Sequence, residues 1–341
     1  MIDLRSDTVT KPTPEMLEYM LRAKVGDDVF GEDPTVNELQ RFAADMFGVD
    51  AALFCPSGTM ANQIAIKAQT HPGDELVCDE GAHVYYYEGG GIASNSGVTT
   101  RTLKGNRGMF TAEQLQEALR PENIHFPKTS IVSIENTCNR GGGKVFDFSE
   151  IEKIREVCDE KELKLHLDGA RLFNALAKEG QSPKNFGQVF DTISICLSKG
   201  LGAPVGSLLL GNKTLINKAI RIRKAFGGGM RQAGFMAAAG LYALQNNVVR
   251  LKEDHDLASS IGSHLNSLGY IEHVLEPQTN MVAFKLSETV VSSNFLRHLT
   301  KDNILAFDIG ENCIRFVTHL DLPTDSLTRI KSCLLNYNSS C

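Results

Sequence analysis

The 341-residue sequence contains no run of about 18 apolar residues, the length that a helix needs to cross a bilayer. Its first residues are polar and partly acidic, unlike those of a secretory signal. These two absences predict a cytoplasmic protein with no membrane partner. Tryptophan is also missing, but its absence excludes no class of protein.

Motifs that would define several common sites are missing as well. None of the eight cysteines forms a Cys-x-x-Cys pair, and several lie in apolar runs, as reduced buried thiols do. The chain has no Gly-x-x-x-x-Gly-Lys-Ser/Thr, His-Glu-x-x-His or Gly-x-Ser-x-Gly motif. Gly200, Gly202 and Gly206 have the wrong spacing for a dinucleotide-binding fingerprint. We therefore expect no metal site and no nicotinamide cofactor.

Acidic residues are absent from one long span. The net charge of −6 gives no indication of a nucleic-acid partner. Between Thr192 and Lys252, however, the chain has no Asp or Glu and is rich in Lys and Arg. Three glycines, 227–229, precede Arg231 in a loop after a basic helix, which favours binding of a phosphate or carboxylate. The alternative is a solvated basic helix face.

Length and periodicity predict the architecture. The chain is long enough for about two domains. Up to about residue 250, apolar strand-like runs alternate with amphipathic helices, which predicts a three-layer α/β fold with a mostly parallel sheet. The pattern then changes to a long charged helix and short strands. We expect a large domain at 1–250 and a smaller α+β domain at 251–341.

One helix start is predicted in detail. Thr35 and Glu38 have the spacing of a capping box, and Val36 and Leu39 begin an apolar face. We expect Thr35 to be the N-cap of a helix that stops at Gly48.

Lys199 is the most informative residue. It directly follows a predicted buried strand, Thr192–Leu197, in a loop rich in glycine that also contains Pro204. Burial lowers the pKa of an amine, and an unprotonated amine can attack a carbonyl carbon. The alternative is a lysine at a strand end that points into solvent.

Asp168 lies at the end of another predicted strand, Lys164–Leu167, where ligands bind in parallel α/β sheets. A carboxylate there can keep a pyridine nitrogen protonated. The alternative is an aspartate that caps the next helix and pairs with Arg171.

Candidate ligand-binding residues also follow two further predicted strands. Ser57, Gly58 and Thr59 lie between a strand and a helix, where backbone N–H groups and the helix dipole favour an anion, although an ordinary Ser/Thr cap is the alternative. His83 follows another strand and is suited either to stacking on a flat ring or to a structural role. A phosphate site, a ring, an acid and a lysine in this order match the groups of pyridoxal 5′-phosphate (PLP).

Six motifs carry a family resemblance. With them the chain resembles the low-specificity L-threonine aldolases, fold-type-I PLP enzymes of the aspartate-aminotransferase-like superfamily, over essentially its full length. The motifs are DLRSDTVT at 3–10, GDDVFGEDP at 26–34, PSGTMAN at 56–62, HLDGAR at 166–171, LSKGLGAPVGS at 197–207 and GGGMRQAG at 227–234.

The resemblance implies a role for each predicted cofactor residue. Lys199 would carry the cofactor covalently, Asp168 would bind its pyridine nitrogen, and His83 would stack on its ring. Ser57, Gly58 and Thr59 would bind the phosphate, together with Arg231 from a neighbouring subunit. The family resemblance also implies a homotetramer with sites between subunits.

The resemblance implies substrate contacts too. Ser6, Arg171 and Arg315 would bind the carboxylate of the amino acid, and Arg171 would also border the cofactor. His125 would lie near the β-hydroxyl group, so His125, His83 and a bound water are the candidates for the catalytic base.

Two residues depart from the family pattern. Phe30 stands where the family commonly has a tyrosine, and Cys138 replaces a common histidine. Neither residue belongs to the lysine chemistry.

The implied reaction is PLP-dependent retro-aldol cleavage of L-threonine, L-allo-threonine and similar β-hydroxy-α-amino acids to glycine and an aldehyde. Such a carbon–carbon lyase would serve threonine breakdown and glycine formation. A β-eliminating lyase or an aminotransferase would use the same lysine and aspartate to break other bonds. A non-catalytic scaffold is the remaining alternative, and the presence of both Lys199 and Asp168 argues against it.

Overall fold

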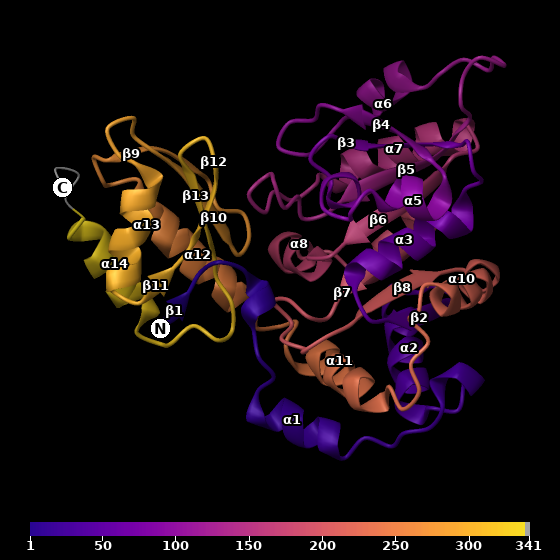
Figure 1. Ribbon diagram of the computed structural model, residues 1–341, viewed down its shortest axis with the longest axis horizontal. Coiled ribbons are helices and arrows are strands. Elements are labelled where there is room, and N and C mark those ends of the chain that lie inside the picture. The colour runs from indigo at the N-terminus through magenta and orange to yellow at the C-terminus, as the bar shows by residue number, and fades with distance from the viewer. Residues whose placement is uncertain (338–341) are drawn as a thin grey trace.

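The computed structural model describes residues 1–337. A seven-stranded sheet with helices on both faces forms its larger part (Figure 1). Across the sheet, the strands are β2 (Ala51–Cys55), β8 (Ser207–Gly211), β7 (Thr192–Cys196), β6 (Lys164–Gly169), β5 (Thr129–Glu135), β3 (Glu75–Asp79) and β4 (Thr99–Leu103). Neighbours pair in parallel except β8, which is antiparallel to β2 and β7. The predicted mostly parallel α/β sheet is confirmed.

Successive side chains of a strand point to opposite faces of the sheet, so buried side chains form a core on each face. In β2, Phe54 packs into the main core, while Leu53 and Cys55 pack into a second cluster on the opposite face. Helices α2 (Pro34–Phe47), α7 (Phe148–Glu160), α8 (Leu172–Glu179), α9 (Pro183–Val189) and α11 (Gly234–Asn246) contribute to the main core. The opposite face is covered by α3 (Gly58–Gln69), α5 (Gly91–Ser96) and α10 (Lys213–Ala225). The larger part therefore has three layers.

Three short helices connect the other elements of the larger part. They are α1 (Pro14–Leu21), α4 (His83–Tyr86) and α6 (Ala112–Ala118). Two single 3-10 turns, Asp7–Val9 and Asp28–Phe30, lie in the N-terminal segment.

The smaller part has its own sheet and core (Figure 1). Its antiparallel strands are β12 (Phe307–Gly310), β13 (Cys313–Val317), β10 (Met281–Leu286) and β9 (Ile271–Leu275), and its helices are α12 (Leu251–Leu265), α13 (Ser292–Lys301) and α14 (Ser326–Leu335). Strand β1 (Ile2–Asp3) pairs with β11 (Ile304–Leu305), which places Ile2 and Leu4 in this core. We propose that the chain divides near residue 250, with its first four residues packed on the smaller part.

The start of α2 differs from the sequence prediction. Asp33, not Thr35, is the N-cap, because its carboxylate accepts hydrogen bonds from the amides of Thr35 (3.1 Å) and Val36 (3.0 Å). Pro34 occupies the first helical position, where its missing N–H has no cost. The Thr35 hydroxyl instead donates to the carbonyl of Lys24 at 2.7 Å. The prediction of Thr35 as N-cap was wrong, because an aspartate two residues earlier offers the stronger acceptor.

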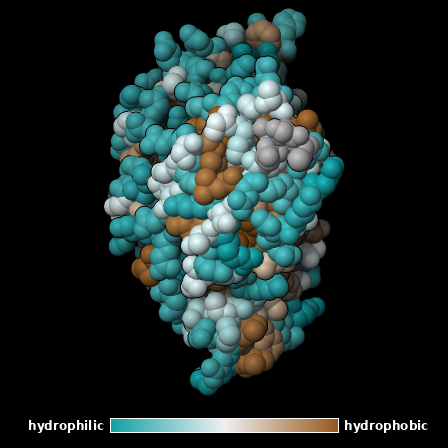
Figure 2. Space-filling view, turned by 90° about the vertical axis from the view of Figure 1, so that its left-hand side faces the viewer, coloured by the Kyte–Doolittle hydropathy of each residue, from teal (hydrophilic) through white to brown (hydrophobic). Residues whose placement is uncertain are grey.

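The face viewed in Figure 2 is mainly hydrophilic, with several small apolar patches between the polar side chains. No helix within residues 1–337 is long and apolar enough to cross a bilayer.

Candidate active site

A pocket of about 260 Å³ opens where β2, β6 and β7 end. These strands run in the same direction, so their carboxyl ends share one edge of the sheet, the usual position of a ligand site in this class of fold. Its walls come from residues far apart in the sequence: Pro56, Ser57, Gly58, Thr59, Asn62, His83, Asp168, Ala170, Cys196, Ser198, Lys199, Pro204 and Val205. The pocket thus brings together the predicted lysine, aspartate, histidine and phosphate turn.

Lys199 lies directly after β7, and its backbone is held in place by two hydrogen bonds. Its carbonyl oxygen accepts from the Thr10 hydroxyl at 3.0 Å and from the Gly202 amide at 2.8 Å. Gly202 has a positive φ of 80°, which explains why glycine follows the lysine at this distance. Lys199 is half-buried, and no ion pair between residues 1–337 includes it. Its amine is therefore available to a ligand in the pocket.

Asp168 is buried at the end of β6 without a cationic partner among the described residues. One carboxylate oxygen accepts from the Ala170 amide at 3.1 Å, and the other from Asn62 Nδ2 at 2.8 Å. The alternative of an Asp168–Arg171 pair is wrong, because Arg171 binds Asp7 and α8 begins without a side-chain cap. A buried anion with only neutral donors is a strong acceptor for a protonated ring nitrogen.

His83 begins α4 and is held at both its backbone and its ring. Its amide donates to Glu135 Oε2 at 2.7 Å, and its Nδ1 lies 2.9 Å from Glu88 Oε1. Burial lowers the pKa of His83, but the hydrogen bond to Glu88 and the charges of Asp168 and Glu88 outweigh it and hold the pKa above 6.5. The anchored ring leaves Nε2 as the nitrogen that can exchange a proton.

The turn into α3 forms the opposite end of the pocket. Ser57 is the N-cap, because its Oγ accepts from the Met60 amide at 3.2 Å, so the capping alternative holds for this residue. Gly58 comes so close to the end of β7 that an added Cβ would lie 2.7 Å from Cys196 Sγ. The first helical N–H groups of α3, at Gly58 and Thr59, have no acceptor within their own helix. They therefore favour an anion in the pocket.

Two arginines meet beside a second hollow of about 470 Å³, which shares His83 with the first. Arg171 Nη1 and Arg315 Nη1 approach Asn139 Oδ1 at 3.5 and 3.0 Å. Asp7 neutralises Arg171, while burial and the Arg171 charge lower the pKa of Arg315. One positive charge is therefore uncompensated here and suits an amino-acid carboxylate.

Ser6 lies between Arg5 and Asp7 in the chain. Arg315 Nη2 donates to the carbonyl of Arg5 at 3.4 Å. Ser6 Oγ accepts from the amide and hydroxyl of Thr8 at 3.2 and 2.9 Å. Ser6 thus lies on the segment that the two arginines contact, with its own proton left to donate.

Two predicted residues lie outside these pockets in a single chain. His125 is exposed in the loop before β5, at the sheet edge opposite the pocket, and its amide donates to Asn123 Oδ1 at 3.0 Å. Arg231 pairs with Asp27 at 2.7 Å, and its guanidinium lies 5.9 Å from the centre of the Phe30 ring. Neither residue lines the Lys199 pocket or the hollow beside the two arginines in its own chain.

The two departures from the family pattern occupy different environments. Phe30 is 73% exposed beside Arg231. Cys138 is buried, and its Sγ donates to the Glu135 carbonyl at 3.2 Å. Burial raises the pKa of Cys138 well above its ordinary value, so it is an inert thiol.

Several polar residues at the site are absent from the sequence-based prediction. Asp7 and Asn62 lie within the quoted motifs, so their positions were available, but their partners were not. Glu88 and Glu135 carried no sequence signal. Burial and the nearby charge of Asp168 raise the pKa of Glu135 to about 7. Asn62, Glu88 and Glu135 contact His83 or Asp168 directly, whereas Asp7 contacts Arg171.

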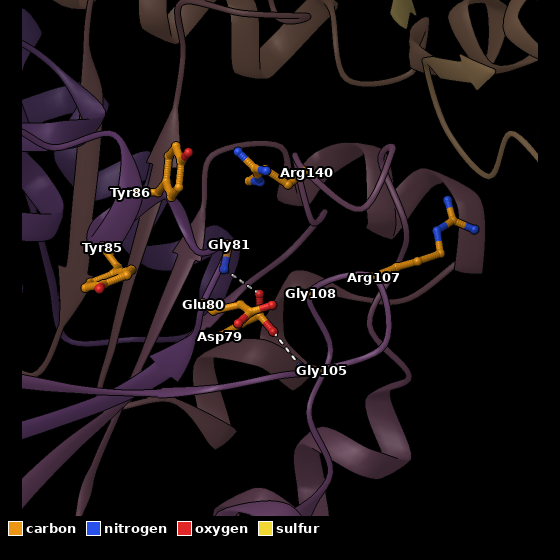
Figure 3. Close-up of a pocket in the computed structure, with 9 residues that line it drawn as sticks. All are labelled: Asp79, Glu80, Gly81, Tyr85, Tyr86, Gly105, Arg107, Gly108 and Arg140. Atoms are coloured by element: carbon orange, nitrogen blue, oxygen red, sulfur yellow. Dashed lines mark hydrogen bonds between the residues drawn. The ribbon is translucent and has the colours of Figure 1, made fainter. Parts of the chain in front are cut away.

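Another hollow of about 400 Å³ adjoins the site but contains none of the predicted residues (Figure 3). Tyr85, Tyr86 and Arg140 stand around it, and Arg140 lies 4.5 Å from the centre of the Tyr86 ring. The carboxylate of Asp79 is occupied by the amides of Gly81 (2.8 Å) and Gly105 (2.9 Å), as Figure 3 shows. We therefore place the catalytic centre in the Lys199 pocket.

The Lys199 pocket fits PLP. It offers a lysine without an ion-pair partner, a buried aspartate without a cation, a histidine ring fixed by Glu88, and a helix N-terminus for a phosphate. Each group of the cofactor has a complementary group of the protein.

Comparisons with known proteins agree with this site. A family model described as beta-eliminating lyase matches residues 3–289. Low specificity L-threonine aldolase of Escherichia coli K12 is 43% identical, with 97% of each chain covered, and low-specificity L-threonine aldolase 1 of Arabidopsis thaliana is 38% identical, with 97% of this chain and 95% of that protein covered. A threonine aldolase structure from Leishmania major superposes with a TM-score of 0.85 at 21% identity, covering 98% and 99% of the two chains.

These matches define a PLP-dependent lyase of fold type I. The chain belongs to the beta-eliminating lyase family, within its group of low-specificity L-threonine aldolases.

Proposed function

We propose that this protein cleaves L-threonine, L-allo-threonine and related β-hydroxy-α-amino acids to glycine and an aldehyde. The observation that carries the proposal is the pocket in which Lys199 and Asp168 face one ligand space beside a pair of arginines. When bound, PLP withdraws electrons from the substrate Cα, which allows a bond at that carbon to break.

Four groups of the chain would hold the cofactor. Lys199 would bind its aldehyde carbon, Asp168 would stabilise a proton on the pyridine nitrogen, and His83 would support the ring. The amides of Gly58 and Thr59, with the Ser57 cap that orders them, would bind the phosphate. Asp168 suits its role because it has no cation to neutralise it within residues 1–337.

The arginine pair would select the bond that breaks. Arg315 binds the substrate carboxylate, and Arg171, held rigidly by Asp7, supports it from the side of the cofactor. Ser6 contributes a hydroxyl from the same segment. Fixing the carboxylate would fix the rotation about the substrate Cα–N bond, and this rotation would select the Cα–Cβ bond for cleavage.

His83 is the base best supported within one chain. Its Nδ1 donates to Glu88, so Nε2 can accept the proton of the substrate β-hydroxyl group. His125 of a neighbouring subunit and a bound water are the other candidates, since His125 lies far from the pocket of its own chain.

We propose a homotetramer in which Arg231 and His125 reach the sites of neighbouring subunits. Exposure of both residues and the lack of a basic side chain among the residues lining the phosphate end support this arrangement. We also propose a cytoplasmic location with a role in threonine breakdown and glycine formation. The seven unpaired, mostly buried cysteines within residues 1–337 suit a reducing compartment.

Product analysis tests the proposed reaction. The purified holoenzyme should convert L-threonine to equimolar glycine and acetaldehyde. The family description also admits β-elimination, which would release ammonia and a keto acid. Ammonia and keto acid as the principal products, or none of the four products, would contradict the proposal. Separate assays of threonine and allo-threonine would then establish the preferred diastereomer.

A further inference from the structure

Asn62 lies between the two carboxylates behind the pocket. It is 2% exposed, in the first turns of α3. Its single Nδ2 group donates to Asp168 Oδ2 and to Glu88 Oε1, at 2.8 Å in both cases. The amide therefore connects the partner of the pyridine nitrogen to the residue that holds the His83 ring.

The orientation of this amide is determined on its other side. Asn62 Oδ1 accepts from Ser194 Oγ at 2.6 Å and lies 3.1 Å from His166 Nε2. The His166 tautomer with its proton on Nε2 donates to this oxygen, while His166 Nδ1 lies 2.9 Å from the Thr192 hydroxyl. A flipped amide would place Oδ1 against the carboxylates of Asp168 and Glu88 and lose both hydrogen bonds to them.

The amide has an electrostatic task. A ring nitrogen of His83 and one carboxylate oxygen each from Glu88 and Asp168 all lie within 4.8 Å of one another. The two carboxylates therefore share a small buried space. Two like charges this close repel each other, so the two carboxylates need a donor between them. The N–H bonds of Asn62 to each carboxylate offset part of this repulsion and fix both side chains.

We propose that Asn62 is a positioning residue that holds the carboxylates of Asp168 and Glu88 in place together. Asp168 can then hold the proton of the pyridine nitrogen while Glu88 fixes the His83 ring over the cofactor. The inference rests on the proposed function, because it assigns Asn62 to the PLP site.

The isosteric exchange Asn62→Asp tests this role, with Gln63→Glu as the matched control. Both exchanges add one carboxylate at a buried position of α3 and both oppose Glu88, since Gln63 Nε2 donates to Glu88 Oε2 at 2.7 Å. Only Asn62 also contacts Asp168. The readouts are PLP affinity by equilibrium dialysis and the pH titration of the bound cofactor's absorption.

Asn62→Asp should weaken PLP binding at least roughly tenfold, the effect of one charge-assisted hydrogen bond, and move the absorption titration to higher pH. Gln63→Glu should change both quantities much less. Equal effects in the two variants, or wild-type values in Asn62→Asp, would overturn the assignment. If Asn62→Asp does not fold, Asn62→Ala removes the donor without adding charge, and wild-type PLP affinity in that variant would overturn it.

The wild-type protein separates this outcome from failure of the proposed function. A wild-type chain that binds no PLP or releases no acetaldehyde contradicts the function itself. A wild-type chain that does both, with an insensitive Asn62 variant, contradicts only the role of Asn62.

Discussion

Arg171 and Asp7 form a buried, two-contact ion pair, with Nε to Oδ2 at 2.8 Å and Nη2 to Oδ1 at 2.6 Å. Burial alone would raise the pKa of Asp7, but the Arg171 charge and hydrogen bond, with Lys199 and Asn280, lower it to about 2 from 3.8. The pair ties the N-terminal segment to the N-cap residue of α8, so it would hold Arg171 in place for the proposed substrate contact.

We expect Asp7→Asn to lower the free energy of unfolding at pH 7 by on the order of 2 kcal/mol, the equivalent of that pKa displacement. Because the folded-state pKa is depressed, this contribution is complete above the unfolded-state pKa and disappears as the pH falls toward about 2. Urea unfolding at several pH values measures it. Asp3→Asn, at the half-exposed Asp3–Arg5 pair, should cost less than about 1 kcal/mol. Equal losses in both variants would contradict a special role of the buried pair.

Arg315→Ala should raise the KM for threonine roughly 10- to 100-fold, the value of one charge-assisted hydrogen bond to a carboxylate. Steady-state kinetics measure this change. Arg297→Ala, at an exposed position of α13, is the control and should leave KM unchanged. An unchanged KM in Arg315→Ala would place the substrate carboxylate elsewhere.

The pH profile tests whether His83 is the base. Its pKa lies above 6.5, so kcat/KM should rise with pH along an acid limb above pH 6.5 as His83 loses its proton. Glu88→Gln removes the anion that stabilises protonated His83, so the limb should move to lower pH. If the limb stays in place in Glu88→Gln, a group other than His83 titrates there.

Subunit mixing tests the predicted contribution of Arg231. Lys199→Ala and Arg231→Ala should each be nearly inactive as homo-oligomers. In mixed oligomers, a site with Lys199 from one subunit and Arg231 from the other is complete, so activity should return after dissociation and reassembly. No recovery in verified mixed oligomers would mean that Arg231 does not complete a neighbouring site.

Much of the fold was predictable from local patterns. The strand–helix alternation up to residue 250 indicated the parallel sheet, and the predicted strands Thr192–Leu197 and Lys164–Leu167 begin where β7 and β6 begin. The antiparallel direction of β8 was not predictable, because burial on both faces leaves no directional signal in Ser207–Gly211. The start of α2 was misassigned because Asp33 and Thr35 are both good caps, and only the tertiary contact of Thr35 with Lys24 separates them.

The main residues of the site were predictable, but their hydrogen-bond partners were not. Lys199, Asp168 and His83 each follow a predicted strand, so the common edge of the sheet brings them together. The partners of these residues were not predictable, because Asn62 and Glu88 are joined to Asp168 only by contacts across 26 or more residues of sequence. The separation of His125 from the pocket of its own chain was also not predictable, because it depends on the strand directions.

Location of the covalently bound cofactor tests the central claim most directly. The holoenzyme is reduced with borohydride, digested and analysed by mass spectrometry. The account predicts that the cofactor is fixed to the peptide that contains Lys199, and that Lys199→Ala loses both this adduct and the formation of glycine from threonine. A cofactor fixed to a different lysine, or full aldolase activity in Lys199→Ala, would contradict it.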